Sequence, residues 1–350
     1  MILNGSDFLT KCESKMLQGL SVLAMVCLHL FCTLSYSELF TPLIYIKGIP
    51  LAFYLAQLSD FCVMGFAFRS GYAHMMLFDK KDYYKKRLVS LFSLYCNYWI
   101  ILIVFTVICV IIGQADFMPG SVTQFIKGFT TVDIQYNGAW WYLPVYAVIV
   151  IISPLLLKAS KRINSILLLI FFSAVYAVGY LLRYRYEAPY QAINWFGPFG
   201  MTIFEYMLGV ICKKENVFEK IEAHISKIKP LWIAIASAVL FVAMLLGHTL
   251  LVRNIIVAPA TGLVLIMILK FCPKPKFVEK TLLFFGKHST NIWLTHMFFY
   301  LVVFKDLVYS ARYPILIYIF MLAICVTVSI VINLIYNPLN AKIQKLKCSN

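Results

Sequence analysis

The stretch GLSVLAMVCLHLFCTLSY, residues 19–36, is an apolar run that contains one ionisable side chain, His29. Its length approaches the roughly 20 residues that an α-helix needs to cross the hydrocarbon core of a bilayer. Runs of similar length and character recur along the chain. The stretch therefore predicts the first of many membrane spans, and it raises the question of why a histidine lies in it.

The composition excludes an ordinary soluble protein. The chain has 350 residues, of which 62% are hydrophobic and 13% are charged. Soluble proteins average roughly 45–50% apolar and about 25% charged residues. We therefore expect an all-α polytopic integral membrane protein, with one membrane-embedded domain over residues 1–350. The longest stretch that we expect to face water is 212–230.

About ten transmembrane helices can be marked from the apolar runs. They cover roughly 16–36, 50–78, 89–113, 140–157, 164–183, 197–212, 231–248, 254–271, 281–304 and 313–336. With the amino terminus inside, 23 of the 31 Lys and Arg residues fall on inner segments and seven on outer ones. Because inner loops carry such an excess, both termini are predicted to be cytoplasmic. No cleavable signal peptide is evident, so we expect the first run to remain as a span.

The net charge of +16 would suggest a nucleic-acid partner in a soluble protein. Here the basic residues form short clusters between apolar runs, so we expect no nucleic acid and instead an anionic cytosolic ligand. The ten cysteines contain no C-x-x-C pair, which favours buried thiols in a reduced protein. Neither zinc-ligand spacing nor a Gly-rich phosphate loop occurs, so no metal and no bound cofactor is expected.

A few ionisable side chains lie inside the predicted spans. Such groups are expensive in a bilayer and indicate function by default. Each also has a structural alternative, which is a hydrogen bond or ion pair to another helix. The set is His29, Asp60, Arg69, Glu205 and His296, with His288 near an inner end.

Five motifs resemble, in order, those of the membrane acyltransferase-3 family. The first is LQGLSVLAMVCLHLF (17–31), where ten residues separate Gln18 from His29. The second and third are LSDFCVMGFAFRSGYAH (58–74) and the basic YYKKRLVSLFSLY (83–95). The fourth and fifth are GAWWYLPVYAVIVIISPLL (138–156) and FGKHSTNIWLTHMFF (285–299). Together they cover the chain from about residue 15 to residue 300.

The resemblance implies transfer of an acyl group, commonly acetyl from acetyl-CoA, to a hydroxyl of a cell-surface polysaccharide or lipid-linked sugar. It places the catalytic histidine of the family at His29 and implies that Arg69 and Arg87 hold the CoA side. Two departures from the family pattern stand out: Gln18 replaces an arginine, and Ala139 stands where many members have histidine. The acceptor and the oligomeric state are not encoded in any motif.

Acyl transfer to an alcohol needs a base and hydrogen-bond donors for the developing oxyanion. His29 and His296 suit a base or a proton relay, and Ser70, Asn291, Tyr142 or the tryptophan indoles suit the donor role. Lysine and arginine offset the CoA phosphates. Our candidates are therefore His29, His296 and Ser70 for catalysis, and Arg69, Arg87, Lys86 and Trp141 for binding acyl-CoA.

Two other classes of protein would use intramembrane polar residues as well. A transporter or flippase of an envelope precursor would line a path with them, and a membrane sensor could share the same fold. Transporters often carry internal repeats and broken helices, and neither is clear in the sequence. We favour the acyltransferase, in a bacterial cytoplasmic membrane and in contact with membrane lipid.

Overall fold

The computed structural model describes residues 10–184, 191–250 and 257–347, and only the backbone of the helical residues 191–194 and 248–250. It is 82% helical. The strands among these residues are the two-residue β1 (Tyr45–Ile46) and β2 (Ile49–Pro50), which pair as an antiparallel hairpin. The prediction of an all-α membrane protein is confirmed.

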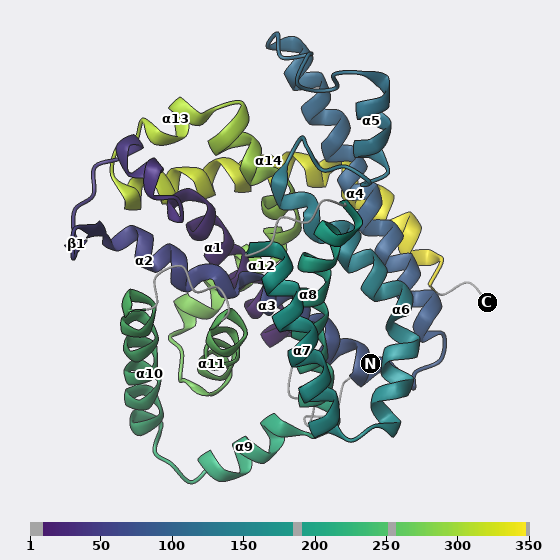
Figure 1. The fold of residues 1–350 in the computed structure, drawn as a ribbon, viewed down its shortest axis with the longest axis vertical. Helices are drawn as coiled ribbons and strands as arrows, with labels where there is room; N and C mark the ends of the chain where they lie inside the picture. The colour runs from purple at the N-terminus through teal and green to yellow at the C-terminus, as the bar shows by residue number, and fades with distance from the viewer. Residues whose placement is uncertain (1–9, 185–190, 251–256, 348–350) are drawn as a thin grey trace. The chain divides into compact units, whose positions relative to one another are not determined.

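The chain divides into two compact units, Met1–Phe78 with Leu155–Ser289, and Asp79–Pro154 with Thr290–Asn350. Unit 1 contains α1 (Lys11–Phe31), η1 (Leu34–Leu39), the β1–β2 hairpin, α2 (Leu51–Leu58), η2 (Ser59–Phe61), α3 (Cys62–Leu77), α7 (Ser165–Tyr184), α8 (Gln191–Lys214), α9 (Val217–Ile225), α10 (Pro230–Leu250) and α11 (Ala258–Phe271). Unit 2 contains α4 (Tyr83–Ile111), α5 (Val122–Phe129), η3 (Gly138–Trp141), the π-helical η5 (Phe298–Val302), α13 (Lys305–Tyr309) and α14 (Pro314–Lys345). Helices α6 (Tyr142–Arg162) and α12 (Lys276–Met297) contribute residues to both units. Figure 1 labels these helices along the chain.

Eight of the described helical segments are long and apolar enough to cross a membrane. They match the first seven predicted spans and the tenth. The predicted span 254–271 corresponds to α11, which has 14 residues, and its predicted start at 254–256 lies outside the described residues. The predicted span 281–304 corresponds to α12 and η5, which carry more polar residues than the other eight.

The first span differs from its predicted bounds. Thr10 Oγ1 accepts a hydrogen bond from the backbone N–H of Glu13 at 3.1 Å, and the Glu13 carboxylate accepts one from the Thr10 backbone N–H at 3.0 Å. This capping box starts α1 at Lys11, and the helix ends at Phe31 instead of 36. His29 therefore lies in the last turn of α1, about 27 Å from the start of the helix.

The second span is present but interrupted. Helices α2 and α3 form one apolar segment, Leu51–Leu77, and the 3₁₀ turn η2 separates them at Ser59–Phe61. The sequence did not predict this break. Asp60 lies in the turn, so an ionisable side chain sits where the α-helical hydrogen bonding of the span is interrupted.

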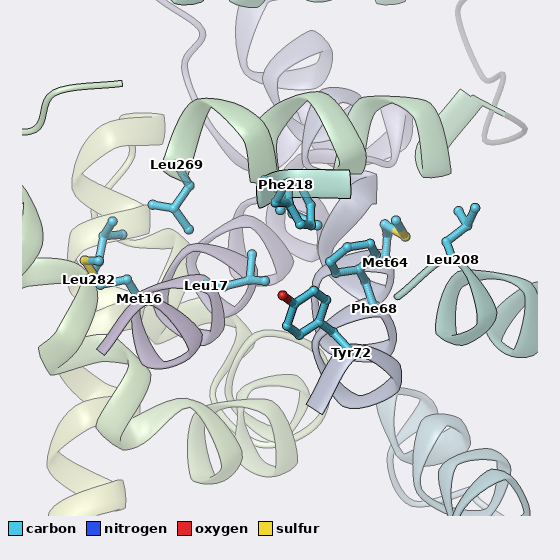
Figure 2. Close-up of a cluster of buried hydrophobic side chains, with 10 residues drawn as sticks. Met16, Leu17, Met64, Phe68, Tyr72, Leu208, Phe218, Leu269 and Leu282 are labelled. Carbon is cyan, nitrogen blue, oxygen red and sulfur yellow. The ribbon is translucent and has the colours of Figure 1, made fainter. Parts of the chain in front are cut away.

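A cluster of apolar side chains forms a core within unit 1. Phe218 from α9 is fully buried there, and its ring contacts Phe68 and Tyr72 of α3 at 5.9 and 6.1 Å between centroids. Figure 2 shows Phe218 together with residues of α1, α3, α8, α11 and α12. The prediction that 212–230 simply faces water is wrong at this position, because α9 is amphipathic and inserts its aromatic residue into the core.

Helices α3 and α8 approach each other through reciprocal glycines. A Cβ added at Gly71 would lie 1.9 Å from the carbonyl oxygen of Tyr206, and one at Gly209 would lie 2.1 Å from the carbonyl oxygen of Phe68. Small residues of this kind let helix backbones pack closely in membranes. The contact fixes α3, which carries Arg69 and Ser70, against α8.

Replacing Gly71 with alanine is expected to lower the thermal unfolding temperature in detergent. The added methyl group meets backbone atoms, and overpacking of this kind costs about 1–3 kcal/mol. The matched control is Gly247→Ala, because no described atom lies within 4 Å of a Cβ added there and alanine is the better helix former. Equal unfolding temperatures for the Gly71 variant and the control would contradict the close contact.

Amide and hydroxyl side chains join three helices of unit 2. Asn97 of α4 donates from Nδ2 to Asn291 Oδ1 of α12 at 2.7 Å. Asn291 in turn donates from Nδ2 to Ser329 Oγ at 3.1 Å and to Asn333 Oδ1 at 3.0 Å, both on α14. Because lipid cannot satisfy these groups, the network holds the three helices in one register.

Candidate active site

One face of α1 carries Ser14, Gln18 and the candidate His29. Ser14 and Gln18 are four residues apart, and His29 follows Gln18 after eleven residues, which is three helical turns. Lys15 borders the same face. The helix therefore presents polar and cationic groups near its start and an imidazole about 16 Å further along the axis.

Arg69 of α3 meets the start of this face. Its Nη1 donates to Ser14 Oγ at 3.1 Å, and its charge is close enough to Lys15 to oppose that ammonium group. Lys15 donates from Nζ to Gln18 Oε1 at 3.1 Å, and in the described part of the chain it makes no ion pair. Lys15 and Arg69 thus both place a cation at the first turns of α1.

Glu13, the acidic residue in the first turn of α1, is engaged by other groups. The Glu13 carboxylate accepts a hydrogen bond from Lys270 Nζ of α11 at 2.7 Å and caps the start of α1 through Thr10. Its charge is already balanced by Lys270. An anion placed between Lys15 and Arg69 would relieve their repulsion, because like charges in partly buried surroundings interact strongly.

Ser70 is buried, and its hydroxyl donates to the carbonyl oxygen of Phe66 at 3.0 Å, one turn earlier on α3. Serine often satisfies itself in this way inside membrane helices. The hydroxyl oxygen can still accept a hydrogen bond. In this structure its proton is directed at its own helix, so Ser70 is arranged as an acceptor.

His296 lies in unit 2 and is fully buried. Its Nδ1 is 2.8 Å from the carbonyl oxygen of Trp293 and 3.2 Å from that of Ile292. Because a carbonyl oxygen only accepts, Nδ1 carries a proton and donates it. The neutral ring then has its lone pair on Nε2, which is the atom that can accept a proton.

The tryptophan motif forms an aromatic group at the start of α6. The Tyr142 ring lies edge-to-face against Trp141 and Trp293, at 5.8 and 5.6 Å between centroids. The indole N–H groups of Trp140 and Trp293 donate to the carbonyl oxygens of Leu294 and Ala139, both at 2.9 Å. The N–H groups of these two indoles are therefore occupied by backbone carbonyl oxygens, contrary to the prediction that they serve as oxyanion donors.

Asn291 is also unsuited to that predicted role. Its Nδ2 donates to α14 and its Oδ1 accepts from Asn97, in the network described above. The amide therefore has no donor left for a substrate. Tyr142 remains a candidate donor among those that the sequence indicated.

The basic candidates of unit 2 lie in the first turns of α4. Lys86 donates from Nζ to the carbonyl oxygen of Lys81 at 3.0 Å, which draws it back over the turn that precedes the helix. Nε of Arg87 is buried and has no hydrogen-bond partner among the described residues. A buried guanidinium N–H in this state is suited to an anionic acceptor.

Comparison with known proteins identifies the family. A model of an acyltransferase domain matches residues 14–334. The chain belongs to the acyltransferase-3 family. Searches of curated proteins and of solved structures found no match.

The acyltransferase domain thus covers all seven candidate residues. His29, Arg69 and Ser70 lie in unit 1, and His296, Arg87, Lys86 and Trp141 lie in unit 2. Within the described residues of the acyltransferase, no group of three or more His, Cys, Asp and Glu side chains is arranged to hold a metal ion.

Sequence reasoning missed Lys15 in this acyltransferase and counted it only as a topology marker. A usable signal was present, because Lys15 precedes Gln18 by three residues and so can reach it on one helix face. The motif departure at Gln18 and the nearby lysine belong to one arrangement, in which the amide oxygen of Gln18 holds the Lys15 ammonium group.

Two acidic side chains lie among the helices of unit 1. Glu205 is 3% exposed, and its Oε2 has no hydrogen-bond partner in the described structure. Asp60 and Arg183 are near enough to act on this carboxyl group electrostatically, and burial acts on it more strongly than either.

Proposed function

We propose that this protein is a membrane O-acyltransferase that takes acetyl from cytoplasmic acetyl-CoA and transfers it to a hydroxyl of a cell-surface polysaccharide or lipid-linked sugar. The family supports an acyltransferase. The donor, the acceptor and the residue roles are the further content of the proposal.

The observation that carries the proposal is the face of α1. The Lys15–Arg69 cation pair lies at its start, and His29 lies in its last turn. A donor with phosphates at one end and a thioester at the other suits such a face. The phosphates would sit between the two cations, and the thioester would extend along α1 toward the imidazole.

The chemistry follows from this placement. His29 accepts the proton of the acceptor hydroxyl while the hydroxyl oxygen attacks the thioester carbonyl carbon. The new C–O bond forms, the C–S bond breaks, and the CoA thiolate leaves and takes up a proton. An alternative order would pass the acetyl group through an acyl-enzyme, and the same base would serve both steps.

The candidates of unit 2 are assigned supporting roles. Arg87 and Lys86 offer cationic donors for phosphate, and Trp141 offers an apolar ring for the donor or for a sugar. His296, with its proton on Nδ1, can accept or relay a proton through Nε2. No resident cofactor is required by this scheme, because acetyl-CoA is a substrate.

The topology belongs to the same proposal. Ten spans with both termini in the cytoplasm would put the basic clusters on the side where acyl-CoA is made. The membrane would be the cytoplasmic membrane of a bacterium, with the glycan acceptor met on its outer side. The acetyl group would then cross part of the bilayer within the protein.

A transporter of an envelope precursor is the competing function, and one observation favours it. The second span is broken at Ser59–Phe61 with Asp60 in the turn, and transporters use interrupted helices at their binding sites. A transporter would move its cargo without consuming acyl-CoA. The two functions therefore differ in whether a free thiol is produced.

The test is thiol release from acetyl-CoA in membrane vesicles of a strain that produces the protein. Inside-out vesicles expose the cytoplasmic face and are expected to release CoA thiol above vector-only vesicles, whereas right-side-out vesicles are not. Purified protein should also be stabilised by CoA against heat, because a ligand that binds the folded state raises its stability. Absence of both effects would reject the enzyme in favour of the transporter.

A further inference from the structure

The segment between α4 and α6 folds back along α4. Tyr98 donates from its hydroxyl to the carbonyl oxygen of Gly128 at 2.6 Å, and Trp99 donates from Nε1 to that of Phe129 at 2.9 Å. The ring of Phe129 stacks on Trp99 with 4.9 Å between centroids. Both donors lie beside the midpoint of the 29-residue α4. Figure 1 shows α5 alongside α4.

This position puts α5 at bilayer depth. Ile111, the last residue of α4, lies about 18 Å beyond Trp99 along the helix axis. The residues of α4 over this stretch include Ile103, Val107 and Ile111, which are 53%, 51% and 77% exposed. Because α4 is long and apolar enough to cross a membrane, we expect these side chains to face lipid, and the end of α5 is hydrogen-bonded to the same helix at Tyr98 and Trp99.

The outward face of α5 is apolar. Val122, Ile126 and Phe129 follow one another at spacings of four and three residues, which places them on one face of the helix. They are 77%, 56% and 38% exposed. The opposite side contacts the protein, where Gly128 packs against the ring of Tyr136.

The backbone ends of α5 are satisfied by side chains. Besides Tyr98 and Trp99, the Thr130 hydroxyl donates to the carbonyl oxygen of Ile126 at 2.9 Å, and Ser121 caps the N–H of Gln124 at 3.2 Å. At a helix end in water, water molecules can satisfy these groups as well as side chains can. In hydrocarbon no water is present to satisfy a backbone group, so these bonds suit a helix that ends within the bilayer.

We infer that α5 is a half-membrane segment whose Val122–Ile126–Phe129 face packs against lipid acyl chains. The occupant is lipid because the apolar face continues the lipid-facing surface of α4 and because the helix ends carry internal hydrogen bonds. Lys127, in the last turn of α5, lies to one side of the apolar face, and its long side chain can turn away from that face. The segment enters and leaves on one side, so it leaves the inside–outside order of the spans unchanged.

The inference is independent of the catalytic proposal and can be tested in the full-length protein. Single cysteines at Val122 and Ile126, in a background without the native cysteines, are labelled with a nitroxide and reconstituted in phospholipid vesicles. Val107→Cys is the lipid reference, and Lys227→Cys, on the exposed turn before α10, is the water reference. Oxygen and a water-soluble nickel chelate on both sides of the membrane serve as relaxation agents.

The nitroxides at Val122 and Ile126 are expected to show the high oxygen and low nickel accessibility of the Val107 reference. Nickel accessibility equal to that of Lys227 would place α5 in water and overturn the inference. Low accessibility to both agents together with spin–spin broadening would assign the face to a second copy of the chain and would also overturn it. Both side chains point away from the protein, so the variants should fold, which gel filtration and thermal unfolding will verify.

Discussion

Replacing His29 with alanine will lower acyl transfer by roughly two to four orders of magnitude. A positioned base contributes about 10²–10⁴-fold when it takes a proton in the transition state. His29 is the imidazole on the face of α1 that begins with the cation pair, and its removal leaves water as the base. Thiol release from acetyl-CoA in inside-out vesicles measures the loss.

The matched control is His224→Ala. His224 is exposed on α9, and its Nδ1 contacts the carbonyl oxygen of Lys220 in the same helix, so its loss should leave transfer intact. Gel filtration and thermal unfolding must show that the His29 variant is folded. Near-normal transfer by a folded, inserted variant would rule out His29 as the base, and loss of transfer only in His296→Ala would move that role to unit 2.

The spans were the most predictable part of this protein, because lipid requires long apolar helices and the apolar runs record that requirement directly. The end of the first helix was harder. Hydropathy extends through residue 36, but the chain leaves the α-helix at Cys32 and forms η1, where Ser37 donates to the carbonyl oxygen of Leu34 at 2.7 Å. Hydropathy reports solubility in lipid and carries no information about hydrogen-bond pattern.

The start of the same helix could have been predicted. Thr10 and Glu13 form the T-x-x-E pattern of a capping box, which was visible in the sequence. Reading it would have placed the first residue at Lys11 and Lys15 one turn into the helix. The cation would then have been compared with Gln18 as a helix neighbour instead of being counted as a topology marker.

The hydrogen bonds that polar side chains make to distant parts of the chain could not be predicted. Nothing local distinguishes the indole of Trp141 from that of Trp140, yet Trp140 donates to Leu294, 154 residues away in the chain. Asn291 is likewise occupied by residues of α4 and α14. Motif reasoning finds which residue types the chemistry needs, and packing decides which of them remain available for it.

Arg69 is the second residue whose replacement is expected to have a large effect. Replacing it with alanine should raise the apparent Michaelis constant for acetyl-CoA by roughly 10- to 150-fold, because a hydrogen bond to a charged group contributes about 1.5–3 kcal/mol. The dependence on the acceptor should change much less. Acetyl-CoA and the acceptor are titrated separately against wild type and variant in inside-out vesicles, which measures the dependence of transfer on each substrate. The control is Arg162→Ala, which removes an exposed cation from the end of α6.

A variant at Lys15 tests whether Arg69 binds the anionic part of acetyl-CoA. If Lys15 and Arg69 hold the same anion, their alanine variants will not be additive, because residues that share a partner show coupling in a double-mutant cycle. The Lys15→Ala, Arg69→Ala double variant should then be weaker toward acetyl-CoA than wild type, but by less than the product of the single effects. Additive effects would mean that the two cations serve different partners. Unchanged donor dependence beside altered acceptor dependence would remove Arg69 from the donor site and place it on the glycan side.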